Sequence, residues 1–276
     1  MKNKILITGA KGQLGCELSK LLKKAILTDR DELDITNFEA VQKFVKANDV
    51  DTIINCAAYT NVDAAEDDEL KAYQLNVTGP ENLAKTGATI IHISTDYVFG
   101  GKHYKPYEPS DEAKPLSVYG KTKLKGEEAV LKNAKTAVII RTAWLYSPYG
   151  KNFVKTMRRL GEEKSEISVV TDQIGTPTYA GDLAKAIVEI LPQIKAGQKS
   201  VYHYTNEGVC SWYDFAVEIM TQSKLKCKVL PIPSSAYPTR AVRPLYSVLS
   251  KEKIKQDFKL TIPHWKEGLK KCIKQF

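Results

Sequence analysis

Apolar residues in the first half of the chain form short runs that alternate with longer, amphipathic segments. The runs are rich in β-branched residues and lie at 4–7, 25–28, 51–58, 89–95 and 137–141. Short apolar runs of this kind are typical of strands, and the segments between them repeat at helical spacing. The run at 89–95 is apolar nearly throughout, as expected of a strand buried in a parallel sheet. We therefore predict an α/β fold with a doubly wound, Rossmann-like parallel sheet.

The pattern changes after residue 146. The later elements are shorter, and prolines and aromatic residues interrupt them, notably between 235 and 244. We expect one domain over 1–146, completed by parts of 178–205, and a smaller α+β lobe mainly over 147–276. Open α/β sheets bind ligands at the carboxyl ends of their strands, so the second lobe should close over that edge and leave a cleft.

The composition is that of an ordinary globular protein, with 43% hydrophobic and 26% charged residues among 276. No run approaches the roughly 18 uninterrupted apolar residues of a membrane span. The apolar stretch at the N-terminus is too short for a signal peptide. The five cysteines are scattered, odd in number and without a C-x-x-C pair, which suits free thiols and argues against a zinc site. We expect a cytoplasmic protein that does not enter a membrane.

The net charge is +9, and the lysines that produce it are spread along the whole chain. No compact basic block with interleaved aromatic residues is present, so we expect no nucleic-acid partner. A solvated, lysine-rich surface is the simplest explanation of the charge. Such a surface would also attract a phosphorylated small molecule.

A glycine-rich turn directly follows the first predicted strand and precedes a helical segment. Strand, turn and helix in this order form the context of a dinucleotide-binding fingerprint, although the spacing here is G-x-x-G-x-x-G. Gly9 would permit the tight turn, Gly12 the close approach of a pyrophosphate, and Gly15 the packing of helix on strand. The candidate cofactor-binding residues of this turn are Gly9, Lys11, Gly12, Gln13, Leu14 and Gly15.

The second strand ends at Asp29 and Arg30, about twenty residues beyond the first glycine, where the residue that contacts the ribose is expected. Asp29 would bind a ribose 2′-OH and favour NADH, whereas Arg30 would bind a 2′-phosphate and favour NADPH. The sequence therefore leaves both cofactors open. Asp34 is equally suited to flank the adenine and to cap a turn. Further candidates for the cofactor site are Asp34, Ile35, Ala57, Ala58, Tyr59 and Asn76.

A helix is predicted from residue 118 to about residue 131, and it carries Tyr119 and Lys123 on one face. A cation beside a phenol favours the phenolate, so we expect the pKa of Tyr119 to fall below its usual value of about 10. A tyrosine of this kind can donate a proton to a carbonyl oxygen. Thr95 ends the fourth strand at the ligand-binding edge, and alternation along the strand allows only one of Ser94 and Thr95 to face the crevice. We take Thr95, Tyr119 and Lys123 as catalytic candidates.

These features together resemble the extended short-chain dehydrogenase/reductase family. Narrower strings resemble its dTDP-4-dehydrorhamnose reductase branch, and they lie at 94–99, 119–123, 152–157, 172–178 and 235–244. The resemblance spans nearly the whole chain and departs at Gly100, where many relatives carry an acidic residue. It implies that NADPH or NADH reduces the C4 keto group of dTDP-4-dehydro-L-rhamnose, with Tyr119 as the acid. Lys123 would also hold the nicotinamide ribose, and Thr95 would bind the 4-oxygen.

The resemblance implies a nucleotide-sugar substrate, and substrate selection should come from the second lobe. Arg243, which precedes a proline, is our candidate for the diphosphate, with a solvated surface arginine as the alternative. The candidates for substrate contacts are Thr95, Val98, Tyr146, Asn152, Gln173 and Arg243.

Several alternatives stay open at this point. The beta subunit of methionine adenosyltransferase, an NADP-binding regulatory protein, resembles these reductases and keeps the Tyr119 to Lys123 string. A reductase or epimerase of another nucleotide sugar is a third reading. A homodimer and a divalent metal such as Mg²⁺ are also open, although no cluster of His, Asp and Glu in the sequence establishes a metal site.

Overall fold

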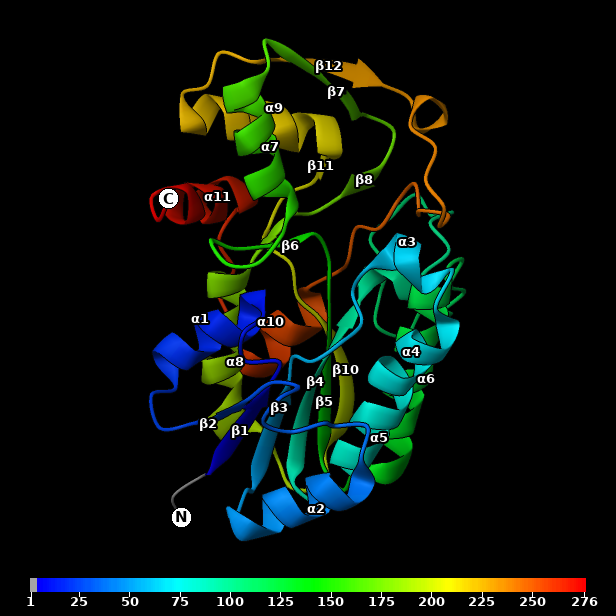
Figure 1. The fold of residues 1–276 in the computed structure, drawn as a ribbon, viewed down its shortest axis with the longest axis vertical. Coiled ribbons are helices and arrows are strands. Elements are labelled where there is room, and N and C mark those ends of the chain that lie inside the picture. The colour runs from blue at the N-terminus through cyan, green and yellow to red at the C-terminus, as the bar shows by residue number, and fades with distance from the viewer. Residues whose placement is uncertain (1–3) are drawn as a thin grey trace.

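A computed structural model describes residues 4–276 of the chain. Its centre is a six-stranded sheet with the order β10-β5-β4-β3-β1-β2, in which every neighbouring pair is parallel (Figure 1). The strands are β1 (Ile5–Thr8), β2 (Ile26–Thr28), β3 (Thr52–Asn55), β4 (Thr89–Thr95), β5 (Ala137–Thr142) and β10 (Lys199–His203). The predicted fold class, a doubly wound parallel sheet with helices on both faces, is confirmed.

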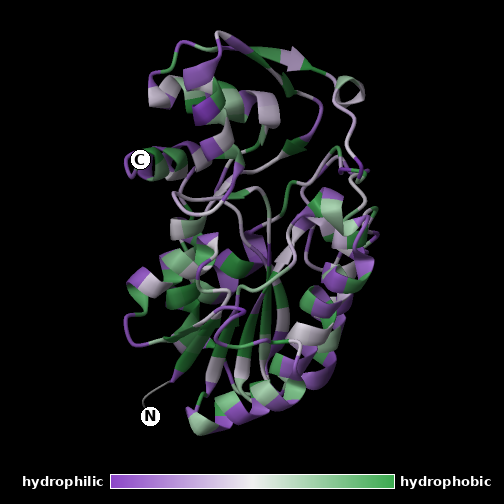
Figure 2. Ribbon diagram, viewed as in Figure 1, coloured by the Kyte–Doolittle hydropathy of each residue, from purple (hydrophilic) through white to green (hydrophobic). Residues whose placement is uncertain are grey.

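Two apolar layers cover the sheet because successive strand residues point to opposite faces. Leu6 packs in one cluster and Ile7 in the other, as do Ile53 and Ile54. Figure 2 shows the strands of the central sheet largely in green, the colour of hydrophobic residues. The helices of the first face are α1 (Gln13–Leu21), α8 (Ala180–Ile190) and α10 (Glu252–Phe258). The helices of the second face are α2 (Phe38–Ala47), α5 (Gly79–Ala84) and α6 (Val118–Asn133).

The acidic segment before α5, residues 62–78, is divided into short pieces. These are α3 (Val62–Ala65), α4 (Glu69–Tyr73) and the π-helical turn η1 (Gln74–Thr78). The backbone of η1 lies so close to α6 that a Cβ on Gly126 would collide with the carbonyl oxygen of Asn76. Glycine at this position therefore permits the close packing of α6.

The second lobe lies beyond the carboxyl edge of the sheet (Figure 1). Its helices are α7 (Phe153–Glu163), α9 (Trp212–Ser223) and α11 (Trp265–Ile273). Its strands are β6 (Leu145–Tyr146), β7 (Glu166–Val170), β8 (Ile174–Gly175), β9 (Thr178–Tyr179), β11 (Cys210–Ser211) and β12 (Lys228–Ile232). They pair two by two, as β6 with β9, β7 with β12 and β8 with β11. Short 3₁₀ turns complete the chain, namely η2 (Asp96–Val98), η3 (Leu191–Gln193) and η4 (Ser234–Ala236).

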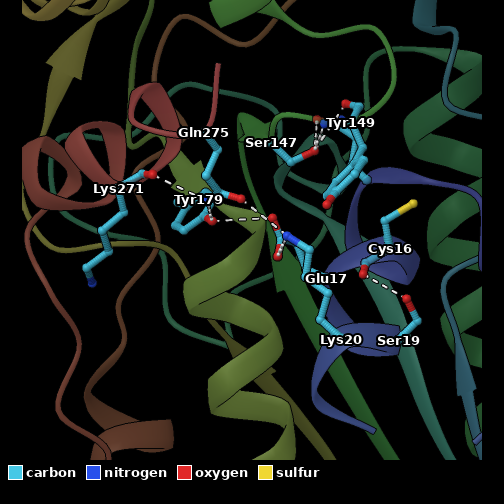
Figure 3. A network of polar contacts seen from close by, with 10 residues as sticks. Cys16, Glu17, Ser19, Lys20, Ser147, Tyr149, Tyr179, Lys271 and Gln275 are labelled. Carbon is cyan, nitrogen blue, oxygen red and sulfur yellow. Dashed lines mark hydrogen bonds and ion pairs between the residues drawn. The ribbon is translucent and has the colours of Figure 1, made fainter. Parts of the chain in front are cut away.

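Polar contacts join α1 to the second lobe (Figure 3). The buried carboxylate of Glu17 accepts hydrogen bonds from the hydroxyl of Tyr179, at 3.3 Å, and from Lys20. The Lys20 amine also lies over the ring of Tyr149, and Gln275 donates to the Tyr179 hydroxyl at 2.6 Å. These contacts fix the second lobe relative to the helix that follows the glycine turn. No helix within residues 4–276 is long and apolar enough to cross a membrane.

Candidate active site

A cavity of about 780 Å³ lies at the carboxyl edge of the sheet, between the sheet and the second lobe. Both parts of the chain contribute to its wall, which suits a site that holds two ligands at once. The predicted site residues that line it are Gly9, Gly12, Gln13, Leu14, Gly15, Asp29, Arg30, Asp34, Ile35, Ala57, Ala58, Thr95, Tyr119, Lys123, Asn152 and Arg243.

The glycine turn has the geometry that a dinucleotide needs. Gly9 has a φ of 65°, and a Cβ there would lie 2.7 Å from the amide nitrogen of Ala57. A Cβ on Gly15 would collide with the carbonyl oxygen of Gly9, so α1 and β1 pack closely. Gly12 is the N-cap of α1 and supplies no side-chain cap. The first amides of α1 and the positive end of its dipole are therefore free to meet an anion, and these residues fit the pyrophosphate of a nicotinamide dinucleotide.

The residues at the end of β2 hold one another in place. One carboxylate oxygen of Asp29 accepts from the amide of Lys11 at 3.1 Å, and the other accepts from the amide of Arg30 at 2.9 Å. The side chain of Lys11 turns to Glu32, at 3.0 Å, and does not line the cavity. Asp34 lines the cavity and also accepts two hydrogen bonds from Thr36, so its side chain also stabilises a turn.

Tyr119 and Lys123 both face the cavity from α6, beside Thr95 at the end of β4. Ser117 caps this helix by accepting from the amide of Gly120 at 3.1 Å, and the helix begins at Val118 as predicted. Burial raises the pKa of Tyr119 well above its usual value, and contact with the Thr95 hydroxyl lowers it by less. The predicted fall of this pKa is therefore wrong for this structure.

Burial of the phenol is the main reason for the difference, and the position of the lysine amine is the second. Lys123 Nζ donates to the carbonyl oxygen of Ile93 at 2.6 Å and lies 3.5 Å from His92 Nε2, so its charge is directed into the sheet. Burial lowers the pKa of Lys123 to about 8, which Glu127 partly opposes. In this arrangement the neighbouring amine does not bring the pKa of Tyr119 below its usual value.

A buried ion pair beneath these residues was not anticipated from the sequence. Arg141 at the end of β5 donates from Nη2 and Nε to the carboxylate of Glu127 on α6, at 2.7 and 2.9 Å. Ser94 donates to the same carboxylate at 2.5 Å. The position of Glu127, four residues after Lys123 on the same helix face, was the signal that could have identified it. The pair ties α6 to both strands that end at the site.

Thr95, the residue after Ser94 and the last of β4, has different hydrogen-bond partners. Thr95 Oγ1 donates to Asp96 at 3.1 Å and accepts from the amide of Tyr97 at 3.2 Å. Ser94 and Thr95 both line the cavity, but only Ser94 bonds to the ion pair. Asp96 is fully buried, one of its oxygens has no hydrogen-bond partner, and burial raises its pKa to about 6.

On the second-lobe side, Arg243 and Asn152 reach the cavity. The guanidinium of Arg243 is paired with Asp63 at 2.6 Å and donates to the hydroxyl of Tyr97 at 3.1 Å. Asn152 donates to the side-chain oxygen of Gln13 at 3.0 Å, so a predicted substrate residue and a predicted cofactor residue touch each other. Arg243 is thus held in a fixed orientation at the cavity wall.

Six of the predicted residues do not line the cavity, namely Lys11, Tyr59, Asn76, Val98, Tyr146 and Gln173. Tyr146 packs in the core of the second lobe, and its hydroxyl donates to the carbonyl of Trp265. Val98 is fully buried in an apolar cluster. Gln173 donates to Ser234 at 3.0 Å. The amide of Asn76 binds the backbone of Tyr59 on both sides and so holds the loop after β3. Each of these side chains has a structural partner that differs from the expected ligand contact.

A pair of stacked tryptophans forms another part of the wall. The rings of Trp144 and Trp212 lie 3.6 Å apart with an angle of 11° between their planes, and both line the cavity. Trp144 has a φ of 49°, and its indole lies where a Cβ on residue 175 would be, so Gly175 leaves the space that the ring occupies. The stack presents a flat apolar surface. Within residues 4–276 no three His, Cys, Asp or Glu side chains gather as metal ligands.

The parallel sheet, the uncapped glycine turn and the Tyr119–Lys123 pair beside Thr95 define the class as a dinucleotide-binding oxidoreductase of the short-chain dehydrogenase/reductase type. The chain belongs to the RmlD substrate binding domain family, whose model matches residues 2–276.

Comparison with individual proteins agrees with this assignment. The chain is 42% identical to a dTDP-4-dehydrorhamnose reductase of Aggregatibacter actinomycetemcomitans, which covers 97% of both chains. It is 40% identical to the spore coat polysaccharide biosynthesis protein SpsK of Bacillus subtilis, over 99% of this chain and 97% of that protein. A solved dTDP-4-dehydrorhamnose reductase of Bacillus anthracis, in complex with NADP, superposes with a TM-score of 0.94 at 40% identity and covers 100% of both chains.

Proposed function

We propose that the protein reduces the C4 keto group of dTDP-4-dehydro-L-rhamnose with NADPH or NADH and forms dTDP-L-rhamnose. The observation that carries the proposal is the placement of Thr95, Tyr119 and Lys123 on the wall of a cavity that also contains the glycine turn. The reductases of Aggregatibacter actinomycetemcomitans and Bacillus anthracis, similar over nearly their full length, support it.

The cofactor would occupy the first-domain side of the cavity. Gly12 and the first amides of α1 would hold the pyrophosphate, and Asp29 and Arg30 at the end of β2 would meet the adenosine ribose. When bound, the dihydronicotinamide supplies the hydride for the reduction. Arg30 is exposed and free of a salt bridge in the part of the chain described, so it can approach a 2′-phosphate. We expect use of both NADPH and NADH, with NADPH modestly preferred.

Residues of the chain would donate the proton that the reduction requires and stabilise the charge that remains. Tyr119 has a raised pKa and therefore holds its proton firmly until a negative charge develops on the substrate oxygen. Thr95, beside it, can donate to the same oxygen and orient the carbonyl when its hydroxyl hydrogen turns from Asp96 to the substrate. A charged Lys123 would stabilise the phenolate that remains. Burial of these groups away from water strengthens each interaction.

The second-lobe side would recognise the nucleotide sugar. Arg243 is the best placed cation for the diphosphate, because Asp63 and Tyr97 fix its guanidinium at the wall. The Trp144–Trp212 stack offers a flat surface for a ring, and Asn152 offers an amide near Gln13.

We infer that the enzyme is cytoplasmic, since all five cysteines are free thiols. A homodimer is compatible with the proposal and is not required by it.

The regulatory alternative, an NADP-binding subunit that acts through another protein, would not need a polarised carbonyl site. The buried placement of Thr95 beside Tyr119 favours the enzyme.

The test is a turnover assay with purified protein, each of the two cofactors, and keto-sugars linked to dTDP, UDP or GDP. The proposal predicts oxidation of NADPH with the dTDP-linked sugar and slow reaction with the others. Binding of NADPH without turnover of any keto-sugar would favour the regulatory alternative, and faster turnover of a UDP- or GDP-linked sugar would reassign the substrate.

A further inference from the structure

The side-chain amide of Asn55, at the end of β3, can take only one orientation. The backbone amide of Ala57 donates to Oδ1 at 3.2 Å, and the hydroxyl of Thr8 donates to the same oxygen at 2.7 Å. A flipped amide would set the NH₂ group of Asn55 against the N–H of Ala57, which has no lone pair to offer. Nδ2 of Asn55 is therefore the atom that lies 2.9 Å from His92 Nδ1.

This orientation determines the tautomer of His92. Since Asn55 Nδ2 is a donor, His92 Nδ1 must accept and carries no proton. A protonated imidazole would place two donors face to face at this contact, so His92 is neutral and its proton lies on Nε2. Burial and the nearby Lys123 both lower the pKa of His92 well below its usual value, which agrees with a neutral ring.

The Nε2–H of His92 points at the amine of Lys123, 3.5 Å away. Among residues 4–276 no other polar partner lies within hydrogen-bond distance of Nε2. A charged ammonium has three N–H groups and no lone pair, so it would leave this buried N–H unmatched. A neutral amine can donate to Ile93 O, at 2.6 Å, and accept from His92 at the same time. The hydrogen bonds are complete only when Lys123 has lost a proton.

The other fully buried histidine has the opposite arrangement. His203 Nδ1 lies 3.0 Å from the carbonyl oxygen of Tyr107, which can only accept, so the proton of His203 is on Nδ1. Its Nε2 then offers a lone pair to Arg141 Nη1, 3.5 Å away. Both buried imidazoles lie beside a cation. His203 directs a lone pair at Arg141, whereas His92 directs an N–H at Lys123.

We propose that His92 is a positioning residue: Asn55 holds it as the Nε2–H tautomer, and it directs this N–H at Lys123 and so favours release of the lysine proton. The groups that face Lys123 from neighbouring elements are His92 on β4, Cys56 after β3, and Glu127 on α6. Burial lowers the pKa of Lys123 to about 8, while Glu127 and Cys56 act to raise it. The N–H of His92 acts in the same direction as burial.

The consequence for catalysis rests on the proposed function. A charged Lys123 stabilises the phenolate of Tyr119, so turnover should decline as the pH rises through the pKa of the lysine. A histidine that eases release of this proton sets the position of that alkaline limb. The contacts Ala57–Asn55–His92–Lys123 also connect the glycine-turn side of the cavity to Lys123, because Ala57 and Lys123 both line it.

The first measurement is made on the full chain without cofactor or substrate, so that it does not depend on the proposed function. Long-range ¹H–¹⁵N spectra of the protein at neutral pH report which ring nitrogen of each histidine carries the proton. The proposal predicts the Nε2–H tautomer for His92 and the Nδ1–H tautomer for His203 in the same spectrum. A His92 that is protonated, or that carries its proton on Nδ1, would overturn the proposal.

The second measurement reverses the tautomer. In Asn55→Asp, the new carboxylate oxygen can accept from His92 Nδ1–H, so Nε2 becomes an acceptor toward Lys123. The titration of ¹⁵N-labelled Lys123 should move up by at least about one pH unit, a tenfold change in proton affinity. The alkaline limb of kcat/KM should move with it. His203→Gln removes the other buried histidine and should leave the Lys123 titration in place.

A shift of Lys123 in Asn55→Asp without a change of the His92 tautomer would mean that the added charge alone acts, and the proposal would fall. A change of tautomer without a shift of Lys123 would overturn it as well. If Asn55→Asp does not fold, His92→Leu removes the N–H directly, and an unchanged or lower Lys123 pKa in that variant contradicts the proposal.

Discussion

The buried pair of Glu127 and Arg141 offers a prediction whose size follows from the structure. In Glu127→Gln the side chain keeps its volume but loses its charge, and Arg141 stays buried without a counter-charge. The side chains of the two residues are only 3% and 6% exposed, so solvent cannot replace the lost partner. Removing one member of a buried pair costs roughly 3–5 kcal/mol. At about 2–4 °C per kcal/mol, Tm should fall by roughly 6–20 °C.

The assay is thermal and urea denaturation followed by circular dichroism. The exposed pair of Arg159 and Glu163 supplies a matched control, because its side chains are 59% and 51% exposed and joined at 2.7 Å. Glu163→Gln should change the free energy of unfolding by less than about 1 kcal/mol. A double change, Glu127→Met with Arg141→Met, should recover most of the loss, since the uncompensated charge is gone. Equal effects of Glu127→Gln and Glu163→Gln would show that burial of the Glu127–Arg141 pair does not determine its contribution to stability.

Four further outcomes are expected. Tyr119→Phe should bind NADPH normally and lose turnover by about 10²–10⁴-fold, and near-normal rates would remove Tyr119 from the mechanism. Arg243→Ala should raise KM for the dTDP-linked sugar and leave the Kd of NADPH unchanged; an unaltered KM would assign the diphosphate to another residue. Arg30→Ala should weaken NADPH but not NADH, as measured by their Kd values, and equal effects would make Arg30 a surface residue. The pKa of Asp96 is raised to about 6, so the native state holds this proton more firmly than the unfolded state. Its contribution to stability is therefore lost as the pH rises from about 4 to 6, by up to roughly 3 kcal/mol. Asp96→Asn should remove that part of the pH dependence in urea titrations, and an unchanged profile would contradict the assignment.

Local patterns were sufficient to predict the sheet and the glycine turn. The alternation of short apolar runs and amphipathic segments reflects strands that are buried on both faces, and this signal does not need tertiary information. The roles of Gly9 and Gly15 could be predicted because both depend on residues nearby in the sequence. Gly9 has a positive φ in the turn, and Gly15 packs closely against Gly9.

Side-chain partners from distant segments could not be predicted in the same way. The predicted fall of the Tyr119 pKa is wrong because tertiary packing buries the phenol, and because the amine of Lys123 bonds to Ile93, thirty residues away. Tyr146 has a sequence position next to the site, yet its ring is drawn into the core of the second lobe. The stack of Trp144 on Trp212 joins residues far apart in the chain, and spacing gives no signal for it. Such contacts depend on how the lobes pack.

Reduction at C4 of a dTDP-linked keto-sugar can be tested by following the transferred hydrogen. The most direct measurement uses NADPH that carries deuterium at the transferable position, with dTDP-4-dehydro-L-rhamnose as substrate, and locates the label in the product by NMR and mass spectrometry. We expect dTDP-L-rhamnose with one deuterium at C4, and at least about a hundredfold less labelled product from Tyr119→Phe over the same time. Deuterium that stays on the cofactor, or that appears at another carbon of the sugar, would contradict reduction at C4.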